Sequence, residues 1–236
     1  MTTVHVGLPS LRGDLARYAA QFGLLEVKPV DASLPRISKL RAWRREVPPS
    51  FVFSVVLPRV VSDLAVTKES TSALETALET ASALEARCLV LVTPASVTPT
   101  SQNKRRLASL IAQCPRDVVT IAWEPRGVWE NEEAAATARD IGAQLVVDVA
   151  REPAPRGPIL YTRLRGIGEA SRLGAGDIER VRAAIQTRRE AFVVIESGSP
   201  ARLAAALMKP FGAAGRTSAP MIIKPPIRIS AEDEEQ

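Results

Sequence analysis

Charged side chains stand at or just after the ends of several short apolar runs in this sequence. The acidic ones are Glu26, Glu124, Asp148 and Glu196, and the basic ones are Arg126, Arg163 and Arg165. Carboxylates beside arginines can bind a divalent cation, transfer protons, or hold an anion through bidentate hydrogen bonds. This chemistry requires that the fold bring residues far apart in the chain to one place.

Other kinds of site find less support. His5 is the only histidine, and zinc sites usually recruit several histidine or cysteine ligands, so a divalent metal other than zinc remains the cofactor to consider. His5 lies within an apolar run, which favours a hydrogen-bonded core histidine over a catalytic one. Cys88 and Cys114 lack CxxC spacing and are interpreted as buried, reduced thiols. There is no GxSxG motif for a serine nucleophile.

Eight short runs rich in Val, Ile and Leu are typical of strands buried on both faces. They cover residues 4–6, 24–27, 51–57, 88–92, 118–123, 144–147, 159–164 and 192–195. Helical periodicity lies between most of them, with Asn131 as a predicted N-cap and Ser199-Pro200 as a predicted helix start. This alternation predicts a parallel α/β fold.

An eight-strand count favours a TIM-like β/α barrel, although periodicity alone leaves a doubly wound open sheet as the alternative. A dinucleotide-binding fold is disfavoured because no GxGxxG motif follows an early strand. The chain has 236 residues, of which 46% are hydrophobic, enough for one large core. We therefore expect a single-domain barrel over residues 1–210 and an extended segment, with an acidic, disordered tip, over residues 211–236.

In a parallel barrel, the loops after the strands form the active face, so the charged groups are expected to meet at one mouth. Glu26, Glu124 and Asp148 are then candidate catalytic residues that bind metal or transfer protons. The candidates for binding a substrate or an anion are Arg126, Arg163, Arg165, Glu196, Tyr161 and Trp129. A structural ion-pair network, in which these charges only satisfy one another, is an equally weighted alternative.

The net charge of +5 invites a nucleic-acid hypothesis, but the basic residues are dispersed in separate clusters and no run of aromatic residues accompanies them. An unknown protein partner or an anionic small molecule is preferred as the ligand. No apolar run approaches the ~18 residues that cross a bilayer, and no secretory signal is visible. We expect a cytoplasmic protein that does not contact a membrane.

Five stretches in the same order resemble the DUF72 (YecE-like) family. They are YAAQFGLLEV (18–27), the stretch 34–59 with its Val-Pro-Pro turn, WEPRGVW (123–129), YTRLRG (161–166) and FVVIESG (192–198). The resemblance covers residues 1–208. It implies a TIM-barrel-like fold but no reaction, since the function of the family is unknown.

The chain also departs from the family pattern. Arg165 stands where the family has a histidine, Glu196 and Ser197 replace an asparagine pair, and Asp63 lies where a histidine follows the third strand. Loss of histidines removes proton shuttles. The resemblance therefore indicates a divergent relative of unknown function, for which a binding or scaffold role is slightly preferred. The alternative is a metal-assisted, phosphodiesterase-like hydrolase of an anionic or phosphate-bearing substrate, so whether the chain is an enzyme stays open.

Overall fold

Strands and helices alternate along the computed structural model, which describes residues 2–29, 35–165, 173–196, 198–209 and 211. The strands are β1 (Thr3–Leu8), β2 (Leu24–Val27), β3 (Val52–Val56), β4 (Cys88–Thr93), β5 (Thr120–Pro125), β6 (Gln144–Leu145), β7 (Ile159–Leu164) and β8 (Glu190–Ile195). The helices are α1 (Leu15–Ala19), α2 (Ile37–Glu46), α3 (Arg59–Ser62), α4 (Lys68–Leu84), α5 (Ser101–Ala112), α6 (Asn131–Asp140), α7 (Ala175–Gln186) and α8 (Pro200–Met208).

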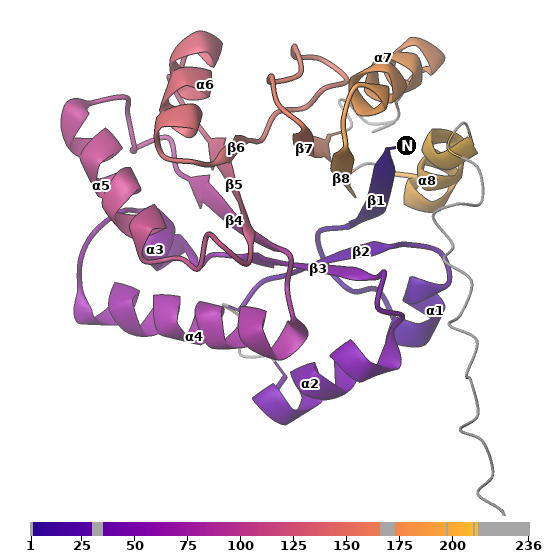
Figure 1. Ribbon diagram of the computed structural model, residues 1–236, viewed down its shortest axis with the longest axis horizontal. Helices are drawn as coiled ribbons and strands as arrows, with labels where there is room; N and C mark the ends of the chain where they lie inside the picture. The colour runs from indigo at the N-terminus through magenta and orange to yellow at the C-terminus, as the bar shows by residue number, and fades with distance from the viewer. Residues whose placement is uncertain (1, 30–34, 166–172, 197, 210, 212–236) are drawn as a thin grey trace, which may run out of the picture.

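All eight strands belong to one parallel sheet, in the order β6-β5-β4-β3-β2-β1-β8-β7. Just beyond β6, a parallel bridge between Val147 and Thr162 of β7 joins the two edges of this sheet. The strands therefore form a nearly closed barrel with the helices around its outside (Figure 1). The prediction of a TIM-like barrel is confirmed over the open-sheet alternative.

Alternation along the strands separates two apolar layers. Leu25 and Phe53 belong to the larger cluster, which includes the buried faces of the helices, whereas Leu24 and Val52 belong to a smaller cluster inside the barrel. That inner cluster comprises Leu24, Val52, Val56, Cys88, Val90, Ala122, Val146, Tyr161, Phe192 and Val194. Because residues two apart share a face, Glu26 follows Leu24 into the interior, and Arg163 follows Tyr161.

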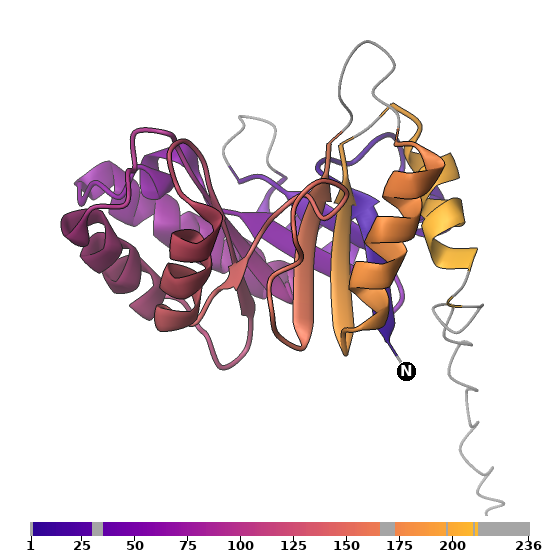
Figure 2. The same ribbon diagram turned by 90° about the horizontal axis from the view of Figure 1, so that it is seen from above.

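Helix α4 illustrates how the sequence encodes the outer layer. The Thr67 side chain accepts a hydrogen bond from the Ser70 amide, and the Ser70 side chain accepts one from the Thr67 amide, which completes a capping box. Leu74, Ala81 and Leu84 then recur on the face that packs against the barrel. Figure 2 shows such helices flanking the strands when the molecule is seen from above.

The connection from β6 to β7 is the exception to the alternation, because residues 146–158, all of which are described, contain no helix. Side-chain hydrogen bonds support this seam instead. Thr162 Oγ1 donates to Val147 O at 2.6 Å and accepts from the Val149 amide at 3.3 Å. The connection across the seam between β6 and β7 is thus a loop alone.

Local details differ from the predictions in a few places. Strand β6 ends at Leu145 rather than at residue 147, and β8 already begins at Glu190. The assignment of Asn131 as N-cap is wrong: Glu130 has the extended backbone of a cap residue, and Asn131 is the first residue of α6. Pro200 does occupy the first turn of α8, as predicted. Residues 212–236 of the predicted C-terminal segment lie outside the described residues.

Within the described part of the chain, no helix combines the length and the apolar character that spanning a bilayer requires.

Candidate ligand site at the barrel mouth

Glu26 projects from β2 into the carboxyl end of the barrel and is completely buried. Its Oε1 accepts hydrogen bonds from Tyr161 Oη at 2.7 Å and from Arg163 Nε at 3.2 Å, and its Oε2 accepts from Arg163 Nη2 at 2.7 Å. Burial raises the pKa of Glu26, while the Arg163 charge and the Tyr161 hydrogen bond oppose this rise. Both oxygens of this carboxylate are therefore engaged by protein groups.

Arg163 joins three carboxylates that come from different strands. Besides Glu26, its Nη1 lies 3.2 Å from Glu124 Oε2 and 3.5 Å from Glu196 Oε1. Burial lowers the pKa of Arg163, but the charges of Glu26 and Glu124 outweigh burial and hold it above its usual range. Arg163 is thus a permanently charged centre for the network.

Arg165 and Arg126 form the outer rim of the same network. Arg165 pairs with Glu124 through Nη2, and its Nε lies 3.1 Å from Glu196 Oε2. Arg126 Nε lies 3.3 Å from Glu124 Oε1. The side chains of Arg165 and Arg126 are 38% and 54% exposed, whereas that of Glu124 is 4% exposed. The carboxylates therefore orient two guanidinium groups that solvent can reach.

Asp148 lies beside this network but serves the loop after β6. Its Oδ1 accepts from the Ala150 amide at 3.1 Å, and its Oδ2 accepts from the Arg165 amide at 3.0 Å. Arg151 Nη1 lies 3.4 Å from the same Oδ2. Asp148 thus binds the backbone at Arg165. The position of Asp148 in the sequence does not reveal this structural contact.

A cavity of about 470 Å³ opens next to the rim arginines. Charged and apolar residues both line it. The residues of this cavity are Glu124, Pro125, Arg126, Gly127, Trp129, Asn131, Ala134, Leu145, Val146, Val147, Glu152, Arg163 and Arg165. Glu124 Oε2 is buried and has no hydrogen-bond donor among the described residues, although the Arg163 charge is close. We name this space the mouth cavity.

Trp129 lines the mouth cavity, where the sequence predicted it. Its ring packs edge-on against Trp123 at a centroid distance of 4.9 Å, and its Nε1 donates to Val97 O at 2.7 Å. Gly127, two residues earlier, has φ +91°, and a Cβ there would lie 2.8 Å from Ala95 Cα. The loops after β4 and β5 are therefore locked together beside the cavity.

The structure thus brings Glu26, Glu124, Glu196, Tyr161, Arg126, Arg163 and Arg165 into one connected group, with Asp148 and Trp129 next to it. Two polar residues of the cavity, Asn131 and Glu152, were not predicted as site residues, although both follow strand ends in the sequence. Lys28 also follows a strand, but it is exposed, and Arg59 pairs with Asp63 on the surface.

His5 lies near the opposite end of the barrel. Its Nε2 is 3.0 Å from Glu190 Oε1, and its ring stacks on Phe192, which confirms a hydrogen-bonded core histidine. Arg87 Nη1 contacts the same Glu190 oxygen at 2.8 Å. Cys88 and Cys114 are buried free thiols, as predicted, and burial raises the pKa of each. None of these groups reaches the mouth.

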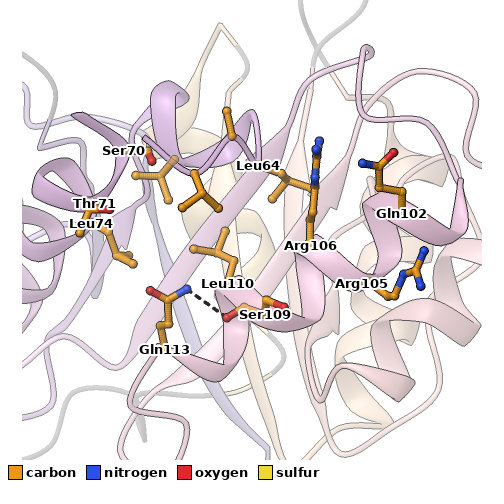
Figure 3. Close-up of a pocket in the computed structure, with 13 residues that line it drawn as sticks. Leu64, Ser70, Thr71, Leu74, Gln102, Arg105, Arg106, Ser109, Leu110 and Gln113 are labelled. Atoms are coloured by element: carbon orange, nitrogen blue, oxygen red, sulfur yellow. Dashed lines mark hydrogen bonds between the residues drawn. The ribbon is translucent and has the colours of Figure 1, made fainter. Parts of the chain in front are cut away.

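A second cavity, of about 360 Å³, lies on the outside of the barrel between α4 and α5 (Figure 3). Leu64, Leu74 and Leu110 line it, together with Arg105 and Arg106 of α5. The candidate site residues lie elsewhere, so this cavity takes no part in the mouth network.

No three His, Cys, Asp or Glu side chains among the described residues are grouped so that they could hold a metal ion. The mouth carboxylates contact arginines and backbone amides instead. The sequence-based suggestion of a divalent metal stays a prediction.

Fold and mouth together define a TIM-barrel-like protein whose carboxyl face carries an arginine–carboxylate network. The family model described as protein of unknown function DUF72 matches residues 5–225, so the chain belongs to this family. The match extends beyond residue 208, where the resemblance in the sequence ended. No curated protein matches this chain.

Solved structures agree with this assignment. A DUF72 family protein from Enterococcus faecalis V583 superposes with a TM-score of 0.70 at 18% identity, covering 89% of this chain and 97% of that one. Another from Thermotoga maritima MSB8 gives a TM-score of 0.69 at 18% identity, with 89% and 99% covered. An L-ribulose 3-epimerase gives 0.61 at 16% identity, with 91% and 94% covered, which shows a shared fold.

Proposed function

We propose that this chain is a binding protein whose barrel mouth takes a small anionic ligand. The observation that carries the proposal is the pair of partly exposed guanidinium groups, Arg126 and Arg165, both held by the buried Glu124 at the edge of the mouth cavity. A guanidinium has five N–H donors, so each arginine can keep its carboxylate contact and still donate to a ligand. Carboxylates that fix the arginines in advance reduce the entropy cost of binding.

Binding is preferred to turnover because the most deeply placed acid–base groups are already engaged. Glu26 is completely buried and accepts hydrogen bonds from Tyr161 and Arg163. Burial and the Glu26 charge raise the pKa of Tyr161 well above its usual value, so its hydroxyl stays protonated and donates to Glu26. A general acid or base must reach the reacting group, which these two residues do not.

Hydrolysis of a phosphate-bearing substrate is the second candidate, and Glu124 is the residue that favours it. Glu124 lines the mouth cavity, and its Oε2 lacks a hydrogen-bond donor among the described residues. If the chain is a hydrolase, Glu124→Gln abolishes turnover of a phosphodiester substrate without abolishing binding. Equal turnover by Glu124→Gln and the wild type would eliminate this role.

The test of the binding proposal is titration calorimetry with inorganic phosphate and sulfate. We expect the double variant Arg126→Gln/Arg165→Gln to bind at least tenfold more weakly than the wild type. Arg139→Gln, an exposed change at the far end of α6, is the matched control and should bind as the wild type does. Absence of binding by the wild type, or equal affinity of the double variant, would contradict the proposal.

The buried free thiols Cys88 and Cys114 support a cytoplasmic location, where cysteines stay reduced. The division into a barrel of residues 1–210 and a separate segment of residues 211–236 is retained as part of the proposal. A protein partner remains the other kind of ligand for this chain, and a pull-down with full-length and shortened chains would reveal it.

A further inference from the structure

We propose that the cavity of about 360 Å³ between α4 and α5, which we name the outer cavity, binds residues 227–235 from a second copy of this chain. This contact makes the protein a dimer and is independent of the ligand proposed for the barrel mouth. Three observations support it: the apolar residues of the outer cavity, its two arginines, and the composition of residues 227–235.

Apolar residues make up much of the lining of the outer cavity. The loop between α3 and α4 contributes Leu64, Ala65 and Val66, and the two long helices contribute Leu74 and Leu110. Val66 is 93% exposed, more than any other large hydrophobic residue that the structure describes. Leu64 has φ +60°, which is rare for a leucine and persists only where surrounding residues fix it. The outer cavity therefore offers a defined apolar surface to a bound chain.

The charged residues of this lining are both basic. Arg105 and Arg106 of α5 are exposed, and no acidic residue is among the described residues that line the cavity (Figure 3). Lys104 of the same helix pairs with Glu133, whereas no described acidic side chain forms an ion pair with either arginine. The outer cavity therefore favours an occupant that combines apolar side chains with negative charge.

The C-terminal part of this sequence has that composition. Ile227 and Ile229 precede four consecutive acidic residues at positions 232–235, Glu-Asp-Glu-Glu. In a chain with a net charge of +5, no other stretch contains four consecutive acidic residues. The isoleucines can pack against the apolar lining while the carboxylates pair with Arg105 and Arg106.

The topology favours a second copy over the same chain as the source of this segment. Strand β4, which α4 precedes and α5 follows, lies four strands from β8 in either direction around the barrel. Helix α8 follows β8, so it lies across the barrel from the outer cavity (Figure 1 and Figure 2). From Phe211 to Glu232 a fully extended chain spans at most about 75 Å, little more than the roughly 70 Å around half of a barrel of this length. A second copy avoids the entropy cost of such stretching.

Each copy offers one segment and one outer cavity. Two such contacts close a dimer with twofold symmetry. The second contact forms within a pair that is already associated, which compensates for the small energy of each exposed ion pair. We therefore expect a reciprocal exchange of segments.

Sedimentation velocity of the full chain over a range of concentrations tests the proposal, and we expect a monomer–dimer equilibrium. A cavity variant, Arg105→Gln/Arg106→Gln, should raise the dissociation constant at least tenfold. A segment variant, in which the four acidic residues 232–235 are replaced by their amides, should do the same. Arg41→Gln/Arg45→Gln removes two exposed arginines of α2, the same charge change as in the cavity variant, and should dimerise as the wild type does.

Val66→Ser tests the apolar part of the contact without changing a charge. Because Val66 is 93% exposed, the substitution leaves the core intact, and we expect the dissociation constant to rise at least threefold. Val118→Ser is the matched control, since Val118 is 80% exposed and does not line the outer cavity. It should leave association unchanged.

Reversal of both sets of charges tests whether they meet. The chain with Arg105→Glu, Arg106→Glu, Glu232→Lys, Asp233→Lys, Glu234→Lys and Glu235→Lys should dimerise again, whereas reversal of either set alone should not.

Three outcomes would overturn the proposal. A wild type that stays monomeric up to about 100 μM would exclude a second copy as the occupant, even if the outer cavity binds its own chain or an unrelated partner. Dimers that persist in the segment variant would place the interface elsewhere. Dimers that are lost in the segment variant but persist in the cavity variant would show that the acidic residues bind another surface.

Discussion

Arg163 compensates the charges of several carboxylates at the barrel mouth. Its guanidinium contacts Glu26, Glu124 and Glu196, which come from β2, β5 and the end of β8. A buried ion pair contributes little net stability compared with apolar packing, but removal of one partner leaves an uncompensated charge. We therefore propose that the network acts chiefly to fix the positions of the rim arginines.

Glu26→Gln tests this view of the network. We expect the variant to lower the free energy of unfolding by roughly 3 kcal/mol, because a buried partner of Arg163 is lost. Urea denaturation measures the change. Glu133→Gln, which removes an ion pair with Lys104 that is about one-third exposed, is the control and should cost less than about 1 kcal/mol. Similar losses in both variants would show that burial is unimportant here.

Glu190 should make stability depend on pH. The hydrogen bond with His5 lowers the pKa of Glu190, Arg87 acts in the same direction, and burial opposes both. A carboxyl group whose pKa is depressed in the folded state stabilises the protein above its unfolded pKa of about 4.3. This contribution is lost as the pH falls through the folded pKa.

We therefore expect wild-type unfolding free energy to fall more steeply below about pH 4.3 than that of Glu190→Gln. Denaturation curves collected between neutral and acidic pH provide the comparison. Parallel pH profiles for the two proteins would show that Glu190 makes no such contribution.

Residue types and strand ends were enough to predict most members of the mouth network. Glu26 and Arg163 both lie in apolar runs, so each had to be satisfied somewhere in the interior. Their partnership could not be predicted, because it joins positions 137 residues apart in the chain. Asp148 shows the converse: a strand-end carboxylate whose partners are mainly backbone amides that the sequence does not identify.

At the scale of elements, the approach of β1 to β2 depends on one glycine. A Cβ at Gly7 would lie 1.7 Å from the Leu24 carbonyl oxygen, so no side chain fits while the two strands stay paired. We predict that Gly7→Ala yields insoluble protein or a melting temperature at least 10 °C lower, as thermal unfolding would show.

Gly176→Ala is the matched control for that substitution. Gly176 lies in α7, and an added Cβ meets no atom within 4 Å. Alanine in a helix should stabilise the protein by about 0.5 kcal/mol. If Gly7→Ala and Gly176→Ala have the same solubility and melting temperature, the close approach of Leu24 to Gly7 does not exclude a side chain at position 7.

Strands were the elements that the sequence predicted best, because runs buried on both faces are apolar without interruption. The start of β8 could not be predicted, since Glu190 is charged and its pairing with His5 and Arg87 depends on the fold. The sequence does contain a signal for the absence of a helix between β6 and β7. Pro153, Pro155 and Pro158 lie in this connection and disfavour a helix there.

At the scale of the whole molecule, the seam between β6 and β7 is the weakest part of the barrel. Within the described residues, one backbone bridge between Val147 and Thr162 and a few side-chain hydrogen bonds join the edges of the sheet, and the connection itself contains no helix. Local opening requires least energy where few contacts are lost.

We predict that amides of β6 and of residues 146–149 exchange with deuterium sooner than those of β3 and β4. Thr162→Val, which removes the hydroxyl contacts with Val147 and Val149, should accelerate this exchange at least fivefold. Hydrogen exchange followed by mass spectrometry measures both effects. Uniform protection around the barrel would contradict a weak seam.

The pairing of β1 with β8 has a consequence for how the chain is made. Among the described residues, one edge of β1 is satisfied only by residues from Arg189 onwards. At ~5–20 residues per second, the ribosome delivers those residues roughly ten to forty seconds after β1. During that interval the nascent chain exposes an apolar strand edge that can pair with other chains, so its yield in a cell should depend on chaperones that bind such edges during translation.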